Sequence, residues 1–181
     1  MRMETADEDL AQAARDGDRP AFAALVARHY DRIHALSFRL TGQRSEAEDL
    51  TQDICLALAA KLGSYRAEAR FTTWLYRVTV NAAHDRRRRA ASHARASDGW
   101  GDWEMNRRAA MAEETLAQDW LTRTMRQLPP ELRDTVALTL GEELSQKDAA
   151  EVLGVSEGTI AWRMSEVKKR LRIIARAEDM L

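Results

Sequence analysis

Side chains recur at steps of three and four residues along most of this chain, and that spacing constrains the fold more than any other feature. Between residues 20 and 40 the recurring positions, nearly all apolar, are Phe22, Leu25, Val26, His29, Ile33, Leu36 and Leu40. Because an α-helix turns once in about 3.6 residues, these positions form one stripe along a helix. The 181 residues include only 8 Gly and 3 Pro, which argues against a Gly-rich β fold. The sequence therefore predicts an all-α protein.

Residues that start and stop helices divide the pattern into separate elements. In the first half we expect helices over residues 7–15, 20–40, 45–62 and 72–89, and in the second half over 113–127, 131–140, 145–153 and 156–175. Gly42 is suited to a left-handed end of the second helix. Ser45 and Glu48 predict a capping box at the start of the third helix.

Residues 90–110 lack a sustained period and are rich in small and polar side chains. We interpret most of this stretch as a flexible linker. The expected organisation is a helical domain over residues 1–92, a linker over 93–111 and a second helical domain over 112–181. Trp100 and Trp103 are unusual in a free linker, and two interpretations stay open: they dock on a partner surface, or they fold back onto a domain.

Cysteine content and apolar runs indicate the compartment. Cys55 is the only cysteine, so a disulfide-stapled secreted scaffold is excluded and a reducing cytoplasm is expected. The acidic first ten residues lack the apolar region of a signal peptide. The longest purely apolar run, residues 54–60, is far shorter than the ~20 residues that span a bilayer. We therefore expect a cytoplasmic protein with no membrane insertion of its own.

Motifs for enzymatic chemistry are missing from the sequence, which contains no Gly-rich phosphate loop, nucleophile elbow or zinc-binding motif. Four carboxylates crowd the first turns of the third expected helix, where they suit the helix dipole: Glu46, Glu48, Asp49 and Asp53. A two-metal site would need further carboxylates or histidines, and no such cluster is visible. We expect no metal, no cofactor and no enzymatic activity.

The net charge of −1 hides a segregated distribution. Residues 61–95 carry nine basic and two acidic groups, and residues 161–181 carry six basic and three acidic groups. Residues 1–60 and 96–160 have net charges of −4 and −7. A polyanion would therefore meet two separate basic zones on one chain, although solvated helix faces explain either zone taken alone.

Residues 146–160 have the spacing of a helix-turn-helix. Such a motif needs a small residue where its helices cross, a turn residue that tolerates positive φ and an apolar anchor on the second helix, and Ala150, Gly154 and Ile160 stand at those offsets. Ser156 would open the second helix, which in this motif enters the major groove of DNA. A three-helix bundle with a basic last helix is the alternative.

A second candidate nucleic-acid segment covers residues 71–89. Its aromatic side chains, which can stack on unpaired bases, are followed by a polar residue and an arginine run that can contact phosphates: Phe71, Trp74, Tyr76, Asn81 and Arg86 to Arg89. Trp74 alone fits ordinary core packing. The combination with Tyr65, Asn81 and the arginine run favours nucleic acid.

Three segments in order make the chain similar to the extracytoplasmic-function (ECF) group of alternative RNA polymerase sigma factors. Residues 47–66 resemble the segment that grips the clamp helices of core polymerase, residues 71–89 resemble the promoter-melting and −10-recognition helix, and residues 128–160 resemble the −35-binding domain. The resemblance covers about residues 10–174. It implies two helical domains, one like sigma region 2 and one like sigma region 4, joined by a flexible linker.

The resemblance also implies roles for individual residues. Core polymerase would be bound by Asp49, Gln52 and Asp53. The −10 DNA would be bound by Tyr65, Arg66, Phe71, Trp74, Arg77, Asn81, Asp85 and Arg86. The −35 DNA would be bound by Ser156, Thr159, Ala161, Trp162, Arg163, Ser165 and Lys168. Two departures from the family pattern are Cys55, where an aromatic is frequent, and Glu166, where a DNA-contacting arginine is common.

The implied function is promoter-specific initiation of transcription, with three partners. They are core RNA polymerase through its β and β′ subunits, promoter DNA as duplex and as melted single strand, and an anti-sigma factor that controls the protein. Two rival classes are a polymerase-independent helix-turn-helix regulator and a protein-interaction module. The first accounts for residues 146–160 but not for the two N-terminal segments.

Overall fold

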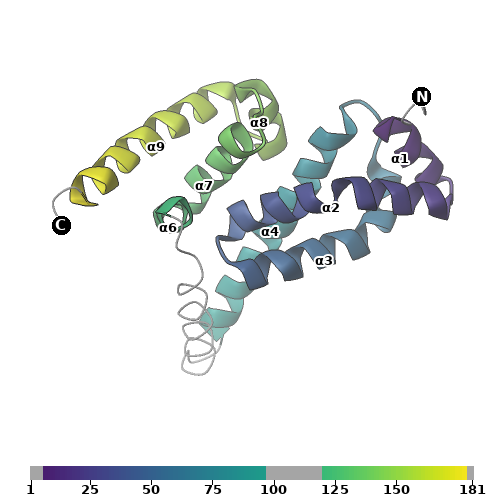
Figure 1. The fold of residues 1–181 in the computed structure, drawn as a ribbon, viewed down its shortest axis with the longest axis horizontal. Coiled ribbons are helices and arrows are strands. Elements are labelled where there is room, and N and C mark those ends of the chain that lie inside the picture. Colours follow the sequence, from purple (N-terminus) through teal and green to yellow (C-terminus); the bar gives the residue numbers. More distant parts are fainter. Residues whose placement is uncertain (1–5, 97–119, 179–181) are drawn as a thin grey trace.

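The computed structural model describes residues 6–96 and 120–178, and within these ranges the regular elements are all helical (Figure 1). The first range contains α1 (Asp7–Arg15), α2 (Arg19–Thr41), α3 (Arg44–Lys61), the short 3₁₀ helix η1 (Leu62–Ser64) and α4 (Phe71–Ala96). The second contains α6 (Trp120–Gln127), α7 (Pro130–Val136), the π turn η2 (Ala137–Gly141), α8 (Gln146–Leu153) and α9 (Glu157–Glu178). The predicted all-α fold is confirmed.

The N-terminal helices pack around α2. Its predicted stripe is buried at Leu25, His29, Ile33, Leu36 and Leu40, and it meets the buried side chains of α3 and α4. Asp18 caps the start of α2 by accepting a hydrogen bond from the backbone N–H of Ala21 at 3.0 Å. Gly42 ends the helix with φ of 72°, as predicted.

The C-terminal helices contain the predicted helix-turn-helix. Ala150 on α8 and Ile160 on α9 are buried where the two helices meet, and Gly154 forms the turn with φ of 65°. Ser145 caps α8 by accepting from the N–H of Asp148, and Ser156 caps α9 by accepting from the N–H of Thr159, each at 3.1 Å. The three offsets and both caps are confirmed.

Helix boundaries differ from expectation in three places. α4 runs to Ala96 instead of ending at residue 89, because four of the residues 90–96 are Ala, the strongest helix former. The predicted capping box is wrong: α3 begins at Arg44, Ser45 lies inside it, and Gln43 is the N-cap without a side-chain hydrogen bond. α7 passes into a π turn. The rest of the expected linker, with Trp100 and Trp103, lies outside the described residues.

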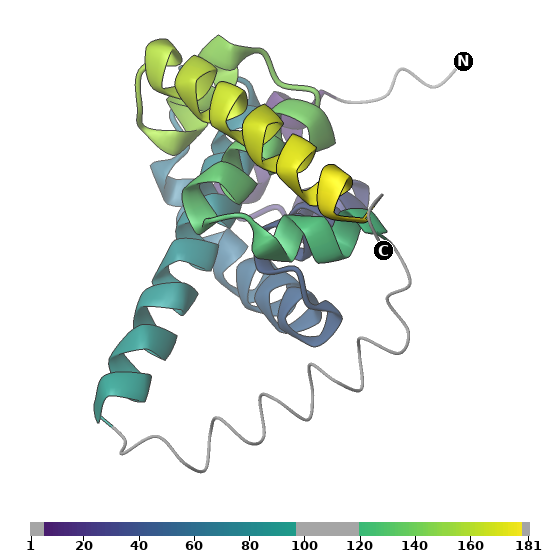
Figure 2. The same ribbon diagram turned by 90° about the vertical axis from the view of Figure 1, so that its left-hand side faces the viewer.

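The helix-turn-helix lies against the N-terminal helices. α8 packs on α4, and α7 with η2 packs on α2 (Figure 1). Buried side chains from both halves form one apolar cluster, to which the second half contributes Ala137, Leu138, Ala149, Ala150, Val152 and Ile160. The end of α4 projects away from the other helices (Figure 2). The packing therefore closes the two domains on each other.

Candidate polymerase and nucleic-acid interfaces

A groove of about 860 Å³ runs between α2 and α3. It is lined from α2 by Phe22, Ala23, Val26, Ala27 and Tyr30, and from α3 by Glu48, Asp49, Gln52, Cys55 and Leu56. Two large apolar side chains stand in solvent beside it, Leu56 at 77% and Tyr30 at 47% exposed. Asp49 and Gln52, two of the predicted polymerase-binding residues, thus lie on the edge of an open, partly apolar groove.

Arg86 joins the predicted polymerase-binding residues. Its guanidinium pairs with Asp49 at 3.0 Å and with Asp53 at 3.2 Å, so it faces α3. Arg86 follows Arg77 by nine residues, which is about two and a half helical turns, so the two side chains leave opposite sides of α4. The structure separates Arg86 from the other predicted −10 residues on this helix.

The aromatic residues at the start of α4 are mostly core. Phe71 is fully buried, with ring centroids 5.3 Å from His29, 5.6 Å from Tyr65 and 5.5 Å from Trp74. Glu8 from α1 accepts a hydrogen bond from the backbone N–H of Phe71 at 3.2 Å. Phe71 therefore supports the fold of this region from inside.

Tyr65 and Trp74 lie in front of Phe71. Tyr65 is 6% exposed, its hydroxyl donates to the carbonyl of Ala69 at 3.1 Å, and burial is the main cause that raises the pKa of its phenol. Trp74 is half-buried, with its ring centroid 5.4 Å from that of Tyr65. Of the aromatic residues predicted to bind −10 DNA, Trp74 is the one that is not buried.

A hollow of about 530 Å³ opens next to Trp74. Its walls are residues 64–69, Trp74, Arg77 and, from α8 of the C-terminal half, Glu151. Arg66 is exposed in its loop, and Ala67 there has a positive φ of 56°, a conformation that non-glycine residues adopt rarely. The hollow combines an aromatic ring with the cationic side chains of Arg66 and Arg77, which suit a base and its phosphate, and its walls also include the carboxylates of Glu68 and Glu151.

The exposed face of α4 continues from this hollow. Asn81 is exposed one turn after Arg77, and Arg88 lies two turns further on the same face. Asp85 is half-buried and pairs with Arg88. Arg77, Asn81 and Arg88 therefore form a polar strip, called here the α4 strip, that leads away from the hollow.

On α9 the predicted −35 residues divide into capping and exposed groups. Ser156 and Thr159 bond to each other at 2.9 Å and shape the start of the helix. Arg163 is half-buried, whereas the side chains free to meet a partner are those of Ala161, Trp162, Ser165 and Lys168, with Trp162 at 61% exposed. Glu166, the departure noted above, pairs with Lys169 at 3.5 Å and Arg170 at 3.6 Å.

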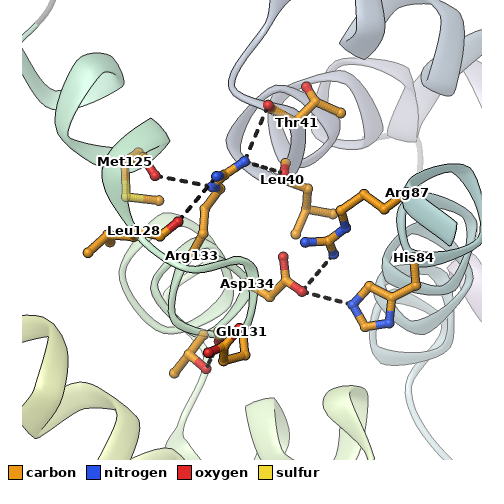
Figure 3. Close-up of polar contacts among 10 residues, drawn as sticks. Leu40, Thr41, His84, Arg87, Met125, Leu128, Glu131, Arg133 and Asp134 are labelled. Carbon is orange, nitrogen blue, oxygen red and sulfur yellow. Dashed lines mark hydrogen bonds and ion pairs between the residues drawn. The ribbon is translucent and has the colours of Figure 1, made fainter. Parts of the chain in front are cut away.

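Polar contacts join the two halves, and these were missed by sequence reasoning. Asp134 on α7 accepts hydrogen bonds from His84 and Arg87 on α4, each at 2.8 Å (Figure 3). Glu142, which follows η2, pairs with Arg39 at 2.6 Å and accepts from the Tyr76 hydroxyl at 2.7 Å. Both carboxylates are nearly covered, at 4% and 8% exposed.

Arg133 completes this contact region. Its guanidinium donates to the carbonyls of Leu40 and Thr41 at the end of α2, each at 3.4 Å, and to three carbonyls of its own half (Figure 3). Burial is the main cause that lowers the pKa of this guanidinium. No sequence signal connects Arg133 with Leu40 and Thr41, because about 90 residues separate them.

The described residues contain no helix that is both long and apolar enough to cross a bilayer. Within those same residues, no group of three or more His, Cys, Asp or Glu side chains is placed to hold a metal ion.

Comparison with known proteins matches both halves of the chain. The family model described as Sigma-70 region 2 matches residues 25–93, and the model described as Sigma-70, region 4 matches residues 118–171. The ECF RNA polymerase sigma factor SigM of Mycobacterium tuberculosis is 37% identical over 171 residues, which cover 94% of this chain and 85% of that protein. The RNA polymerase sigma-H factor of Pseudomonas aeruginosa is 29% identical over 184 residues, 94% of each chain.

Among solved structures, CnrH in complex with the cytosolic domain of CnrY superposes with a TM-score of 0.69 at 27% identity, covering 96% of this chain and 99% of that one. RpoE of Bartonella quintana, solved with the anti-sigma factor NepR, gives the same TM-score at 19% identity and covers 86% and 96%. Two family models in the expected order and a relative above 30% identity over nearly the whole chain agree. The chain belongs to the ECF RNA polymerase sigma factors, which are transcription initiation factors and not enzymes.

Proposed function

We propose that this sigma factor divides its work among three surfaces. The α2–α3 groove binds core RNA polymerase, the hollow beside Trp74 with the α4 strip captures melted −10 DNA, and the exposed face of α9 reads the −35 element. The observation that carries the proposal is that the groove and the hollow share no lining residue and belong to a chain whose two halves match sigma regions 2 and 4. The domain boundaries at residues 92 and 112 stay a prediction.

For polymerase, the groove offers what a protein partner needs: exposed Leu56 and Tyr30 for apolar contact and carboxylates at the rim. Asp49 and Asp53 are about two-thirds exposed, so their ion pairs with Arg86 are weak, and basic groups of a partner can replace them. We expect Asp49→Arg and Asp53→Arg to weaken binding to purified core polymerase while leaving thermal unfolding nearly unchanged. Asp9→Arg, at an exposed position on α1, is the matched control. Normal binding by both variants would remove the groove from the interface.

For the −10 element, Trp74 provides a ring for stacking, and Arg77 and Arg66 lie beside it. Stacking contributes ~1–3 kcal/mol per base, comparable to the few kcal/mol that flipping a base costs. A captured base therefore shifts the duplex towards the melted state. Asn81→Ala is expected to reduce permanganate reactivity of the melted region more than polymerase binding, and Ser92→Ala, exposed on the same helix, serves as control. An unchanged footprint with Asn81→Ala contradicts the assignment.

For the −35 element, α9 is the second helix of the helix-turn-helix and its exposed face carries Ala161, Trp162, Ser165 and Lys168. In this motif the second helix lies in the major groove, where apolar side chains contact thymine methyl groups and cations contact phosphates. Lys168→Ala is expected to weaken −35 binding and to reduce the salt slope by about 1. Lys61→Ala, at the end of α3, is expected to change neither quantity.

An anti-sigma factor is proposed as the controlling partner. The support is the similarity to CnrH, which was solved with the cytosolic domain of CnrY, and to a fold that in RpoE of Bartonella quintana is held by the anti-sigma factor NepR. We place the protein in the cytoplasm, because promoter DNA and polymerase are found there. Co-purification of a partner that blocks polymerase binding supports this control, and a protein fully active in cells without any such partner contradicts it.

A further inference from the structure

We propose that α1 is a positioning element for base capture, because it holds both ends of the loop that forms one wall of the hollow beside Trp74. This loop, called here the capture loop, is residues 65–70, of which residues 65–69 line the hollow. The structure gives the positioning role to Glu8 and Arg15 of α1. The inference rests on the proposed function of the hollow, and it requires no contact between α1 and DNA.

Glu8 holds the C-terminal end of the capture loop. Its Oε1 atom accepts a hydrogen bond from the backbone N–H of Phe71 at 3.2 Å. Phe71 is the first residue of α4, where backbone N–H groups have no acceptor within their own helix. Arg70 precedes it, and an arginine side chain has no acceptor with which to cap that turn. A carboxylate from α1, 63 residues away in the sequence, therefore caps α4 and fixes the point where the loop ends.

Arg15 holds the N-terminal end of the capture loop. Its Nη1 atom donates to the carbonyl oxygen of Tyr65 at 3.4 Å, across 50 residues of sequence. The Tyr65 hydroxyl in turn donates to the carbonyl of Ala69 at 3.1 Å, so the first residue of the loop is tied to one near its end. Glu8 and Arg15 are seven residues apart, about two helical turns, and so they project from the same face of α1. One helix face thus contacts both ends of the loop.

α1 is itself fixed to the rest of the N-terminal half. Ala11, in the middle of the helix, is 1% exposed and belongs to the apolar core. Asp7 pairs with two residues of α2, Arg28 at 2.6 Å and His29 at 2.9 Å. The helix packs on α2, η1 and α4 (Figure 1). Because α1 is anchored at these points, its bonds to the capture loop constrain the loop.

The capture loop needs this constraint because its backbone is strained. Ala67 has a φ of 56°, a conformation that persists only where surrounding contacts impose it. Arg66, Ala67 and Glu68 are exposed, so the fixed ends of the loop supply those contacts. A loop already held in the shape that receives a base loses less conformational freedom when the base binds. The two bonds from α1 therefore favour capture of a base next to Trp74.

The test measures base capture by holoenzyme assembled from core polymerase and the full chain. The probe is the non-template single strand across the −10 element of a promoter mapped by run-off transcription. It is compared with a strand that has an abasic residue at the position where loss of the base weakens binding by wild type most. The dissociation constant of the abasic strand divided by that of the intact strand is called here the capture ratio. A fraction of unfolded protein lowers the affinity for both strands equally and leaves this ratio unchanged.

Glu8→Ala/Arg15→Ala removes both contacts of α1 with the loop. It is expected to lower the capture ratio about tenfold, because each lost hydrogen bond shifts the loop about threefold away from its capture-competent form. Binding of the abasic strand and of core polymerase is expected to stay unchanged. The matched control, Asp9→Ala/Arg19→Ala, removes the same charges from exposed positions nearby and should keep the wild-type ratio. Glu8→Gln/Arg15→Lys retains an acceptor and a donor, and its ratio should lie near that of wild type.

Two results would overturn the positioning role: a wild-type capture ratio in Glu8→Ala/Arg15→Ala, or an equal loss in the matched control. Trp74→Ala separates this failure from failure of the proposed function, because it removes the stacking ring itself. If Trp74→Ala lowers the ratio and the α1 variant does not, the hollow stands as the capture site and the role of α1 falls. If Trp74→Ala leaves the ratio unchanged, the hollow does not capture the base, and both proposals fail.

Discussion

Replacing Phe71 with alanine separates a folding role from a DNA-binding role. The resemblance to the ECF family implies a DNA contact for this residue, yet its side chain is 0% exposed and three rings surround it. Truncating a buried Phe to Ala costs about 3–5 kcal/mol through lost burial and the cavity left behind. Because aromatic pairs add ~0.5–1.5 kcal/mol each, the loss here is expected at the upper end, about 4–5 kcal/mol.

Such a loss is a large share of the ~5–15 kcal/mol that stabilises a domain. Urea unfolding followed by circular dichroism measures it, and Phe71→Leu, a milder change, keeps the domain folded for binding assays. Under conditions in which the urea titration shows the Phe71→Leu variant to be folded, this variant is expected to bind the −10 single strand nearly as well as wild type. Asn81→Ala should show the opposite pattern, with stability within ~0.5 kcal/mol of wild type and weak strand binding. A Phe71→Leu variant with unchanged stability and lost strand affinity would contradict a purely structural role for Phe71.

Three further predictions concern single contacts. Tyr76→Phe removes the hydroxyl that donates to Glu142 at 2.7 Å. Losing a hydrogen bond to a charged acceptor costs ~1.5 kcal/mol or more, so the two halves of the chain should separate more often, as measured by energy transfer between a dye on each half. Equal transfer in the variant and in wild type would contradict the contact. Burial, opposed by Asp7, lowers the pKa of His29 below its usual 6.5, so the unfolded state binds more protons and the unfolding free energy should fall as pH drops from 7.5 to 5.5. His29→Gln should flatten this pH dependence and His34→Gln should keep it; identical slopes in both would exclude His29 as the cause. Gly154→Ala places a Cβ on a residue with φ of 65°, and no atom lies within 4 Å of it. Calorimetry should therefore show a loss of unfolding free energy of only ~1–2 kcal/mol, which is the cost of the left-handed conformation. A much larger loss would mean that the turn is packed against other atoms.

The local features of this fold are readable from its sequence because they depend on neighbours in the chain. The three- and four-residue spacing from Leu25 to Leu40 predicts both the helix and its buried face, and the structure confirms both. Gly154 and Ser156 likewise act on residues within one turn, so the helix-turn-helix could be placed in advance. The end of α4 was less predictable, because the helix continues past Arg89 to Ala96 without a Gly or Pro between them.

The candidate sites depend on contacts between distant residues, and there the sequence was less informative. Phe71 has the residue type of a base-stacking platform, but the packing of α1 and α2 over the start of α4 buries it. Arg86 belongs to a basic run, yet the helical turn directs it to Asp49 and Asp53. Leu56 lies within the apolar run of residues 54–60, yet its side chain is 77% exposed. Such outcomes follow from tertiary packing, which local periodicity does not encode.

The contact between the domains could not be foreseen from either half alone. Glu151 and Arg77 are 74 residues apart, and each has an ordinary sequence context on an exposed helix face. Their pairing adds to the segregated charge pattern, because individual carboxylates of the second half, Glu151 and Asp134, pair with arginines of α4. The same opposite charges that suggested two footprints for nucleic acid also close the chain on itself.

Run-off transcription measures whether this protein directs initiation by core RNA polymerase. Purified core RNA polymerase is incubated with fragmented genomic DNA, with and without this protein, and the 5′ ends of the transcripts are mapped. We expect new start sites that depend on the protein, each preceded by shared sequence elements near −35 and −10. Transcripts that are identical with and without the folded protein, together with no binding to core polymerase, would contradict its role as a sigma factor.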